Sequence, residues 1–171
     1  MASYCLRRKM AVPDRHEFRQ VVGLLPTGVT VVSAFYEDGP AGATASAVCS
    51  LSLEPMMMLV CLDRGSRTLA AVEEAGRFGI NVLGLDQRSA AEIFATKVSL
   101  EEKWRSVAWR RHLDVPVIEG CPAHIVCGLH EVIDGGDHVI LTGDVIEVEA
   151  EPAEPLVYHG GLFRKLETDG Q

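Results

Sequence analysis

The stretch GATASAVCSLSLEPMMMLVCLD (Gly42–Asp63) begins with small and hydroxylated residues and ends in an apolar run. Met57–Asp63 has the length and apolar content of a buried strand. Gly42–Val48 and the β-branched segment Val29–Tyr36 predict a hairpin, with its turn at Asp38-Gly39-Pro40. Because strands joined by tight turns run antiparallel, this part of the chain favours an antiparallel sheet.

The rest of the chain continues with hairpins and a few short helices. Helices are expected at Glu17–Leu25, ended by Pro26-Thr27-Gly28, and at Ser66–Ala75 and Gln87–Lys97. Further strands are expected at Phe78–Leu83, at His124–Ile133 and His138–Ala150 around the turn Asp134-Gly135-Gly136-Asp137, and once within Pro155–Leu166. Trp104–Val117 is expected to be irregular, with short pieces of structure. The pattern predicts an antiparallel barrel or sandwich, and no G-x-G-x-x-G supports a Rossmann site.

Length, composition and charge limit the domain organisation and the partners that this chain can have. The chain has 171 residues with 47% hydrophobic content and a formal net charge of −8. We expect one domain over residues 16–171 after an N-terminal arm over residues 1–15. The charge argues against nucleic acid or an anionic membrane as a partner, since both need concentrated Lys and Arg. With no apolar membrane segment and no secretory signal, the cytoplasm is the expected location.

The cysteines indicate free thiols and no metal site. There are five, with no C-x-x-C pair: Cys5, Cys49, Cys61, Cys121 and Cys127. An odd, unclustered set is typical of reduced, mostly buried thiols in the cytoplasm. A zinc site would need clustered Cys or His ligands, and the sequence shows no such cluster.

Even spacing of hydroxyls suggests a ligand cradle. On one extended chain Thr44, Ser46, Ser50 and Ser52 would share a face. Hydroxyls and backbone N–H groups together suit the polar edge of a heteroaromatic ring. The alternative is an ordinary polar face turned to solvent.

Three other segments are candidates for ligand contact. Ser66-Arg67-Thr68 at a helix start, with Arg64 nearby, suits a phosphate, although a simple helix cap is the plainer interpretation. His138 at a hairpin turn and the glycines within Tyr158–Phe163 are further candidates, each with an exposed turn as the alternative. No nucleophile–base motif is present, so in an enzyme a cofactor would carry the chemistry.

Six segments in this order resemble one family. They are PTGVTVVSA, GATASAVCSLSLEP, LVCLDRGSRT, FGINVL, DHVILTGDVIEV and PLVYHGGLFRKL, spread between about Phe18 and Leu166. The chain resembles the flavin reductase-like family, the small reductase components of two-component flavin-dependent monooxygenases.

The resemblance implies an antiparallel Greek-key split β-barrel with a few short flanking helices, working as a homodimer. It implies an NAD(P)H:flavin oxidoreductase that binds FAD or FMN and takes a hydride from NADH or NADPH. The reduced flavin would diffuse to a partner monooxygenase. The resemblance does not indicate whether FAD or FMN is preferred, or whether NADH or NADPH is. It also leaves open the identity of the oxygenase.

The resemblance also implies which residues bind. His138 would position the nicotinamide. The cofactor-binding positions would be Thr44, Ala45, Ser46, Ser50, Leu51, Ser52, Cys61, Ser66, Thr68, Asn81, Tyr158, Gly161 and Phe163. Ala47, Cys49 and Met56 depart from the usual pattern, and Ala47 removes one hydroxyl from the cradle.

Three alternatives compete with a reductase. One is a flavin- or haem-binding storage or sensor module on the same barrel. Another is a pyridoxamine-phosphate oxidase-like enzyme, which would carry more basic residues near its phosphates than Arg64 and Arg67. The last is a non-enzymatic dimeric scaffold without flavin affinity.

Overall fold

The computed structural model describes residues 12–37 and 39–167. The expected arm over residues 1–15 lies almost entirely outside these ranges, as does Cys5. Within them, no helix has the length and apolar content needed to cross a membrane.

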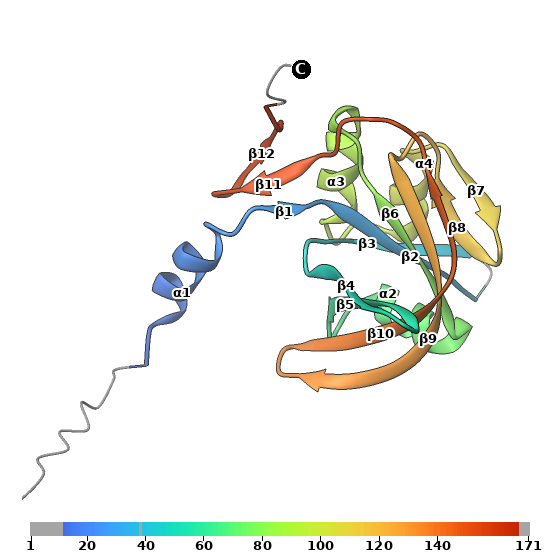
Figure 1. The fold of residues 1–171 in the computed structure, drawn as a ribbon, viewed down its shortest axis with the longest axis horizontal. Helices are drawn as coiled ribbons and strands as arrows, with labels where there is room; N and C mark the ends of the chain where they lie inside the picture. The colour runs from blue at the N-terminus through green and yellow to red at the C-terminus, as the bar shows by residue number, and fades with distance from the viewer. Residues whose placement is uncertain (1–11, 38, 168–171) are drawn as a thin grey trace, which may run out of the picture.

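A seven-stranded antiparallel sheet forms the body of the molecule (Figure 1). Its strands lie in the order β3-β2-β6-β9-β10-β5-β4, so the two hairpins of the opening stretch sit at opposite edges. The sheet curls, and Ala45 of β3 shares an apolar core with Val60 of β5. The bounds are β2 (Thr30–Tyr36), β3 (Gly39–Ala45), β4 (Val48–Leu53), β5 (Met56–Asp63), β6 (Arg77–Val82), β9 (Ala123–Gly135) and β10 (His138–Ala150). The predicted mostly β, antiparallel fold is confirmed.

Two smaller sheets accompany the main one. β1 (Thr27–Gly28), β11 (Val157–His159) and β12 (Leu162–Arg164) form one, so the C-terminal segment holds two strands rather than the single one expected. β7 (Trp109–His112) and β8 (Val115–Ile118) form the other.

The short pieces expected within Trp104–Val117 are two kinds of regular element. The segment contains the end of α4 (Leu100–Arg105) and then the β7–β8 hairpin. The hairpin turn consists of Leu113 and Asp114, both with positive φ (44° and 60°). Such turns usually carry Asn-Gly or Asp-Gly, so the usual sequence signal is missing.

The helices begin at polar caps. The Asp14 side chain accepts from the backbone N–H groups of His16 and Glu17 and starts α1 (Arg15–Val22), two residues before the expected start. The predicted cap Ser66 starts α2 (Arg67–Ala75), and Gly76 ends it at φ 61°. The expected helix over Gln87–Lys97 is shorter at both ends: a 3₁₀ turn (Leu85–Gln87) precedes α3 (Arg88–Phe94), and Ala95 is its C-cap.

A close approach joins α3 and α4 to β3. A methyl group at Gly42 would lie 2.7 Å from Phe94 Cε1 and 3.0 Å from Trp104 Cζ2. The two aromatic rings meet edge to face at 4.9 Å and fill a core between the helices and the sheet. The absence of a side chain at Gly42 therefore lets α3 and α4 lie directly against β3.

Candidate functional site

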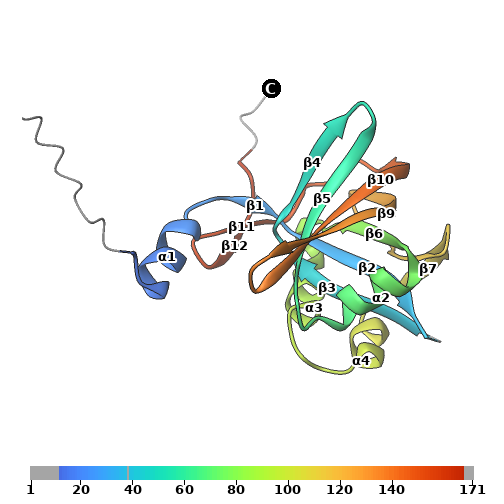
Figure 2. The ribbon, with the colours of Figure 1, turned by 90° about the horizontal axis from the view of Figure 1, so that it is seen from below.

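A groove with a volume of about 660 Å³ opens beside β3. Figure 2 shows α2, α3 and α4 gathered along this edge of the barrel. The groove is lined by residues 42–47, 61–63, 65–68 and 94–97, together with Leu100, Lys103 and His138. Its size is typical of a small-molecule or cofactor site.

The lining of the groove is cationic although the chain is acidic. The charged residues that line the groove are three cations, Arg67, Lys97 and Lys103, and one carboxylate, Asp63. The whole chain, in contrast, carries a net charge of −8. A local excess of positive charge in an acidic protein favours an anionic ligand in this groove.

The start of α2 forms one wall. The Ser66 side chain accepts from the backbone N–H of Thr68 at 3.2 Å, and the first turn carries no acidic residue. The Arg67 guanidinium donates to the Val98 carbonyl at 2.6 Å, which fixes the loop after α3. The helix dipole and the Ser66 and Thr68 hydroxyls make this wall suitable for a phosphate.

Arg64, a second candidate cation, points elsewhere. Its guanidinium pairs with Asp134 and donates to the Gly136 carbonyl at 3.1 Å. It therefore anchors the β9–β10 turn and does not line the groove.

The edge of β3 forms the opposite wall. Within residues 12–37 and 39–167, β3 pairs with β2 alone, so its other edge has no strand partner there. The Thr44 hydroxyl donates to the Ala91 carbonyl at 2.7 Å and so ties β3 to α3. The Thr44 hydroxyl hydrogen is thus bonded within the protein. Along this edge β3 therefore offers a ligand mainly its backbone groups.

The prediction that four hydroxyls share one face of an extended chain is wrong. β3 ends at Ala45, the chain turns at Ser46 and Ala47, and β4 begins at Val48. The register between β4 and β5 also shifts between Ser50 and Ser52. A period of two holds only within an uninterrupted strand, so the even spacing is broken twice.

Lys103 is a groove residue that the sequence did not reveal. Its side chain is buried, and Nζ donates to the Phe94 carbonyl at 3.0 Å and the Gly42 carbonyl at 3.4 Å. Burial, and then the nearby Arg67, lower the pKa of Lys103 below its ordinary value. A lysine between acidic residues and a tryptophan in a short helix gives no sequence signal of this position.

His138 stands at the first position of β10, paired with Asp63 of β5. Its Nδ1 lies 2.8 Å from the Asp137 carboxylate, and its side chain is 48% exposed. The hydrogen bond with His138, and its charge when protonated, lower the pKa of Asp137. His138 therefore presents a ring with one nitrogen already oriented at the mouth of the groove.

The structure brings together seven of the fourteen expected site residues. Those that line the groove are Thr44, Ala45, Ser46, Cys61, Ser66, Thr68 and His138. Ser50, Leu51 and Ser52 lie on β4, at the far edge of the sheet. Tyr158, Gly161 and Phe163 belong to the β11–β12 hairpin and do not line the groove.

Asn81 lies in the core rather than at the groove. Its Nδ2 donates to the Val31 carbonyl and the Ser33 hydroxyl, each at 3.0 Å. Its Oδ1 accepts from the Ile118 N–H at 2.8 Å. These three hydrogen bonds join β2, β6 and β8, which is a structural role in this subunit.

Known proteins share both sequence and fold with this chain. A model of the flavin reductase-like domain matches residues 22–167. The reductase component of a 4-nitrophenol 4-monooxygenase/4-nitrocatechol 2-monooxygenase from Rhodococcus opacus is 41% identical over 150 residues, covering 88% of this chain and 80% of the relative. An NADH flavin reductase from Kitasatospora aureofaciens is 40% identical, covering 85% and 78%. An NADH:FAD oxidoreductase of Streptomyces globisporus, solved with NAD and FAD fragments, superposes with a TM-score of 0.86 at 34% identity, covering 92% and 96%.

Proposed function

Because the chain belongs to the flavin reductase-like family, it is an NAD(P)H:flavin oxidoreductase, and we propose that FAD and NADH are the pair it uses. It supplies reduced flavin to a partner monooxygenase. The solved relative that holds NAD and FAD fragments supports this pairing, since it covers 92% of the chain.

We place the flavin in the groove beside β3. The observation that carries this assignment is its cationic lining, three cations against one carboxylate in a chain of net charge −8. The start of α2, with Ser66 and Thr68, suits the phosphate. The free edge of β3 at Thr44 and Ala45, with Ser46 directly after it, suits the polar rim of a flat ring. The donor set thus fits a flavin nucleotide.

When bound, the flavin supplies the two-electron acceptor for the hydride that the reduced nicotinamide donates. The chain supplies binding and orientation, which bring the two reactants together in one groove. His138, held by Asp137 at 2.8 Å, orients the nicotinamide at the groove mouth. Lys103 and backbone N–H groups provide positive potential where negative charge arrives.

We also propose that a second copy of the chain completes the site. The helix α1 has no buried residue, and in Figure 1 it projects from the barrel. The N-terminal apolar patch consists of Phe18, Val21, Leu24 and Leu25, and each of these side chains is between 58 and 66% exposed. Apolar side chains clustered in this way are typical of an interface. In a homodimer the β11–β12 hairpin, with Tyr158, Gly161 and Phe163, would reach the groove of the partner.

Two further proposals follow from the sequence. Residues 16–171 form one reductase domain after the arm, in keeping with the family match over residues 22–167. The enzyme works in the reducing cytoplasm, which suits the free thiols of Cys49, Cys61, Cys121 and Cys127.

The decisive experiment is NADH and NADPH oxidation by the purified full chain with FAD, FMN or no added flavin. We expect turnover that requires added flavin and is faster with FAD and NADH. Faster turnover with FMN or NADPH would overturn the proposed pair but not the reductase activity. No turnover with any combination would leave a flavin-binding module.

A further inference from the structure

Three strands bring two imidazoles and a carboxylate together away from the groove. His112 comes from β7, His124 from β9 and Glu147 from β10, and their candidate ligand atoms all lie within 4.8 Å of one another. In the β9–β10 register, His124 stands opposite Glu149, and Glu147 is two residues away on the same face of β10. The β7–β8 hairpin covers this face and adds His112.

The His124 ring carries an unpartnered nitrogen. The residue is only 6% exposed, yet its Nε2 makes no hydrogen bond with any residue that the structure describes. The Glu149 carboxylate lies 3.1 Å away but outside the direction that a hydrogen bond requires. A buried polar atom without a partner is costly, so its position calls for an explanation.

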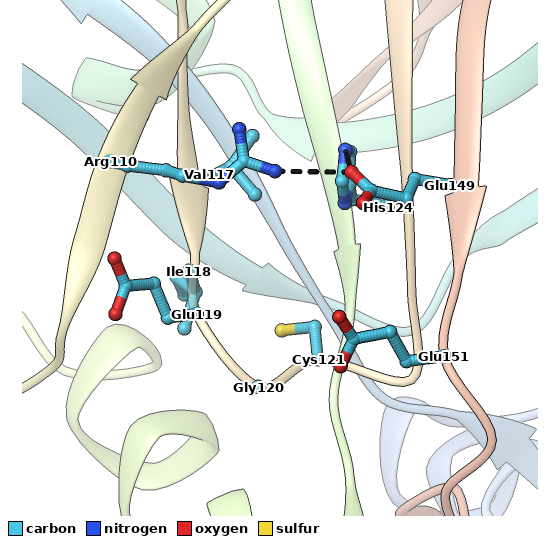
Figure 3. Close-up of a pocket in the computed structure, with 9 residues that line it drawn as sticks. All are labelled: Arg110, Val117, Ile118, Glu119, Gly120, Cys121, His124, Glu149 and Glu151. Atoms are coloured by element: carbon cyan, nitrogen blue, oxygen red, sulfur yellow. Dashed lines mark hydrogen bonds and ion pairs between the residues drawn. The ribbon is translucent and has the colours of Figure 1, made fainter.

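The surroundings attract a cation. A small pocket of about 150 Å³ adjoins His124 and is lined by the carboxylates of Glu119, Glu149 and Glu151 against one guanidinium, that of Arg110 (Figure 3). Arg110 donates to Glu149 at 3.1 Å and neutralises it. Glu147, which contacts His112 instead, stays available as a ligand.

We propose that His112, His124 and Glu147 bind a divalent transition-metal ion of the zinc class. Two imidazole nitrogens and one carboxylate oxygen are ligands that zinc prefers, and water would take the fourth position. The proton that His112 and Glu147 share in their contact moves to the other ring nitrogen or leaves to solvent when the metal binds. No bond is made or broken in a substrate, and no electron is transferred.

The site has a structural role. His138, at the groove, and Glu147 are nine positions apart on β10, about 30 Å of strand at about 3.3 Å per residue. The β7–β8 hairpin is a separate two-stranded sheet, so an ion shared by β7, β9 and β10 fastens it to the barrel. Metal binding should therefore raise stability without entering flavin reduction.

The test is a Zn²⁺ titration of the full chain against a chromophoric chelator, with a Co²⁺ absorption spectrum to report ligand geometry. Cys5, which lies outside the described residues, and the exposed Cys49 are replaced by serine so that thiolates do not contribute. We expect one ion per chain, tetrahedral Co²⁺ bands and a higher Tm in Zn²⁺. His112→Ala and Glu147→Gln should each weaken binding at least about 10-fold.

His130→Ala is the matched control. His130 lies on the same strand pair and contacts Asp144 at 2.9 Å, but no third ligand joins them among the described residues. It should leave the affinity unchanged. His112 and Glu147 are partly exposed, so their variants should fold, and unchanged circular dichroism would establish that. No stoichiometric ion, or equal affinity in all three variants, would overturn the proposal.

Discussion

At the scale of single residues, the groove depends on three positions whose role the residue type alone does not indicate. Gly42 matters for the side chain it lacks, since Phe94 and Trp104 occupy that space. Lys103 matters because its ammonium is buried against backbone carbonyls at the groove. His138 matters because Asp137 orients its ring. Gly42 and Lys103 act through residues distant in the sequence, whereas Asp137 directly precedes His138.

Gly42→Ala should destabilise the protein by about 1–3 kcal/mol, because the added methyl group overpacks the Phe94–Trp104 contact. Urea unfolding would measure the free energy change. Gly39→Ala, also on β3, is the control, because a Cβ there meets no atom within 4 Å. Similar losses in the two variants would contradict the role given to Gly42.

His138→Ala should raise the KM for NADH about 10-fold, the equivalent of one lost contact of about 1.4 kcal/mol, and leave the flavin Kd nearly unchanged. Steady-state kinetics and flavin titration separate the two effects. His130→Ala removes another exposed histidine and should change neither value. A parallel loss of flavin affinity would move His138 from the nicotinamide to the flavin.

Two buried thiols predict an alkaline loss of stability. Burial raises the pKa of Cys121 and of Cys127 to about 12, from an ordinary value of 9.0. Between pH 9 and pH 12 the unfolded thiols lose protons while the folded ones keep them, so the unfolding free energy falls as pH rises. Cys127→Ala should flatten that fall in urea unfolding measured from pH 8 to 11. An unchanged slope would show that Cys127 does not contribute to it.

At the scale of elements, local sequence specified the start of α2 and the long β9–β10 hairpin, but not the ends of α1 and α3 or the β7–β8 hairpin. Ser66 caps α2 as predicted, and β9 and β10 flank their glycine-containing turn. β7 and β8 were missed because Leu113 and Asp114 replace the usual turn residues. The contribution of α2 can therefore be tested by a substitution at its cap, Ser66. The β7–β8 hairpin depends instead on its tertiary contacts.

Ser66→Ala should cost about 1 kcal/mol of stability through loss of the helix cap and also weaken flavin binding, because this helix start lines the groove. Ser99→Ala removes the comparable cap of α4, where Ser99 accepts from the Glu102 N–H at 3.1 Å. Thermal unfolding should respond to both substitutions. Flavin titration should respond to Ser66→Ala alone, and an equal response would remove the α2 start from the site.

At the scale of the whole molecule, the barrel is well packed while the N-terminal apolar patch is left open. Beyond β1, the connection of α1 to the body includes the hydrogen bond from the Gly160 N–H to the Gly23 carbonyl at 2.8 Å. Half of the expected site residues also lie off the groove of their own subunit. The proposed second copy would cover the N-terminal apolar patch and would account for the position of the β11–β12 hairpin.

Replacing Val21 and Leu25 together by Asp should convert a dimer into a monomer, because charge would be buried in the proposed interface. Sedimentation velocity measures the change, and flavin affinity should fall with it. Val148→Asp alters another exposed apolar residue, on β10, and should leave the dimer intact. A monomeric wild-type chain, or dissociation by Val148→Asp alone, would contradict the proposed interface.

The sequence by itself determined the family, the antiparallel strands and the capped helix beside the groove, because these depend on short-range spacing and on residue types along the chain. Only the tertiary structure decided the rest. It broke the hydroxylated stretch into two strands at opposite edges of the sheet, buried Asn81 and turned Arg64 away from the groove. It also assembled His112, His124 and Glu147 from three strands up to 35 positions apart, where no local cluster of Cys or His indicated a metal. Such contacts depend on sheet order and curvature, which local sequence does not specify.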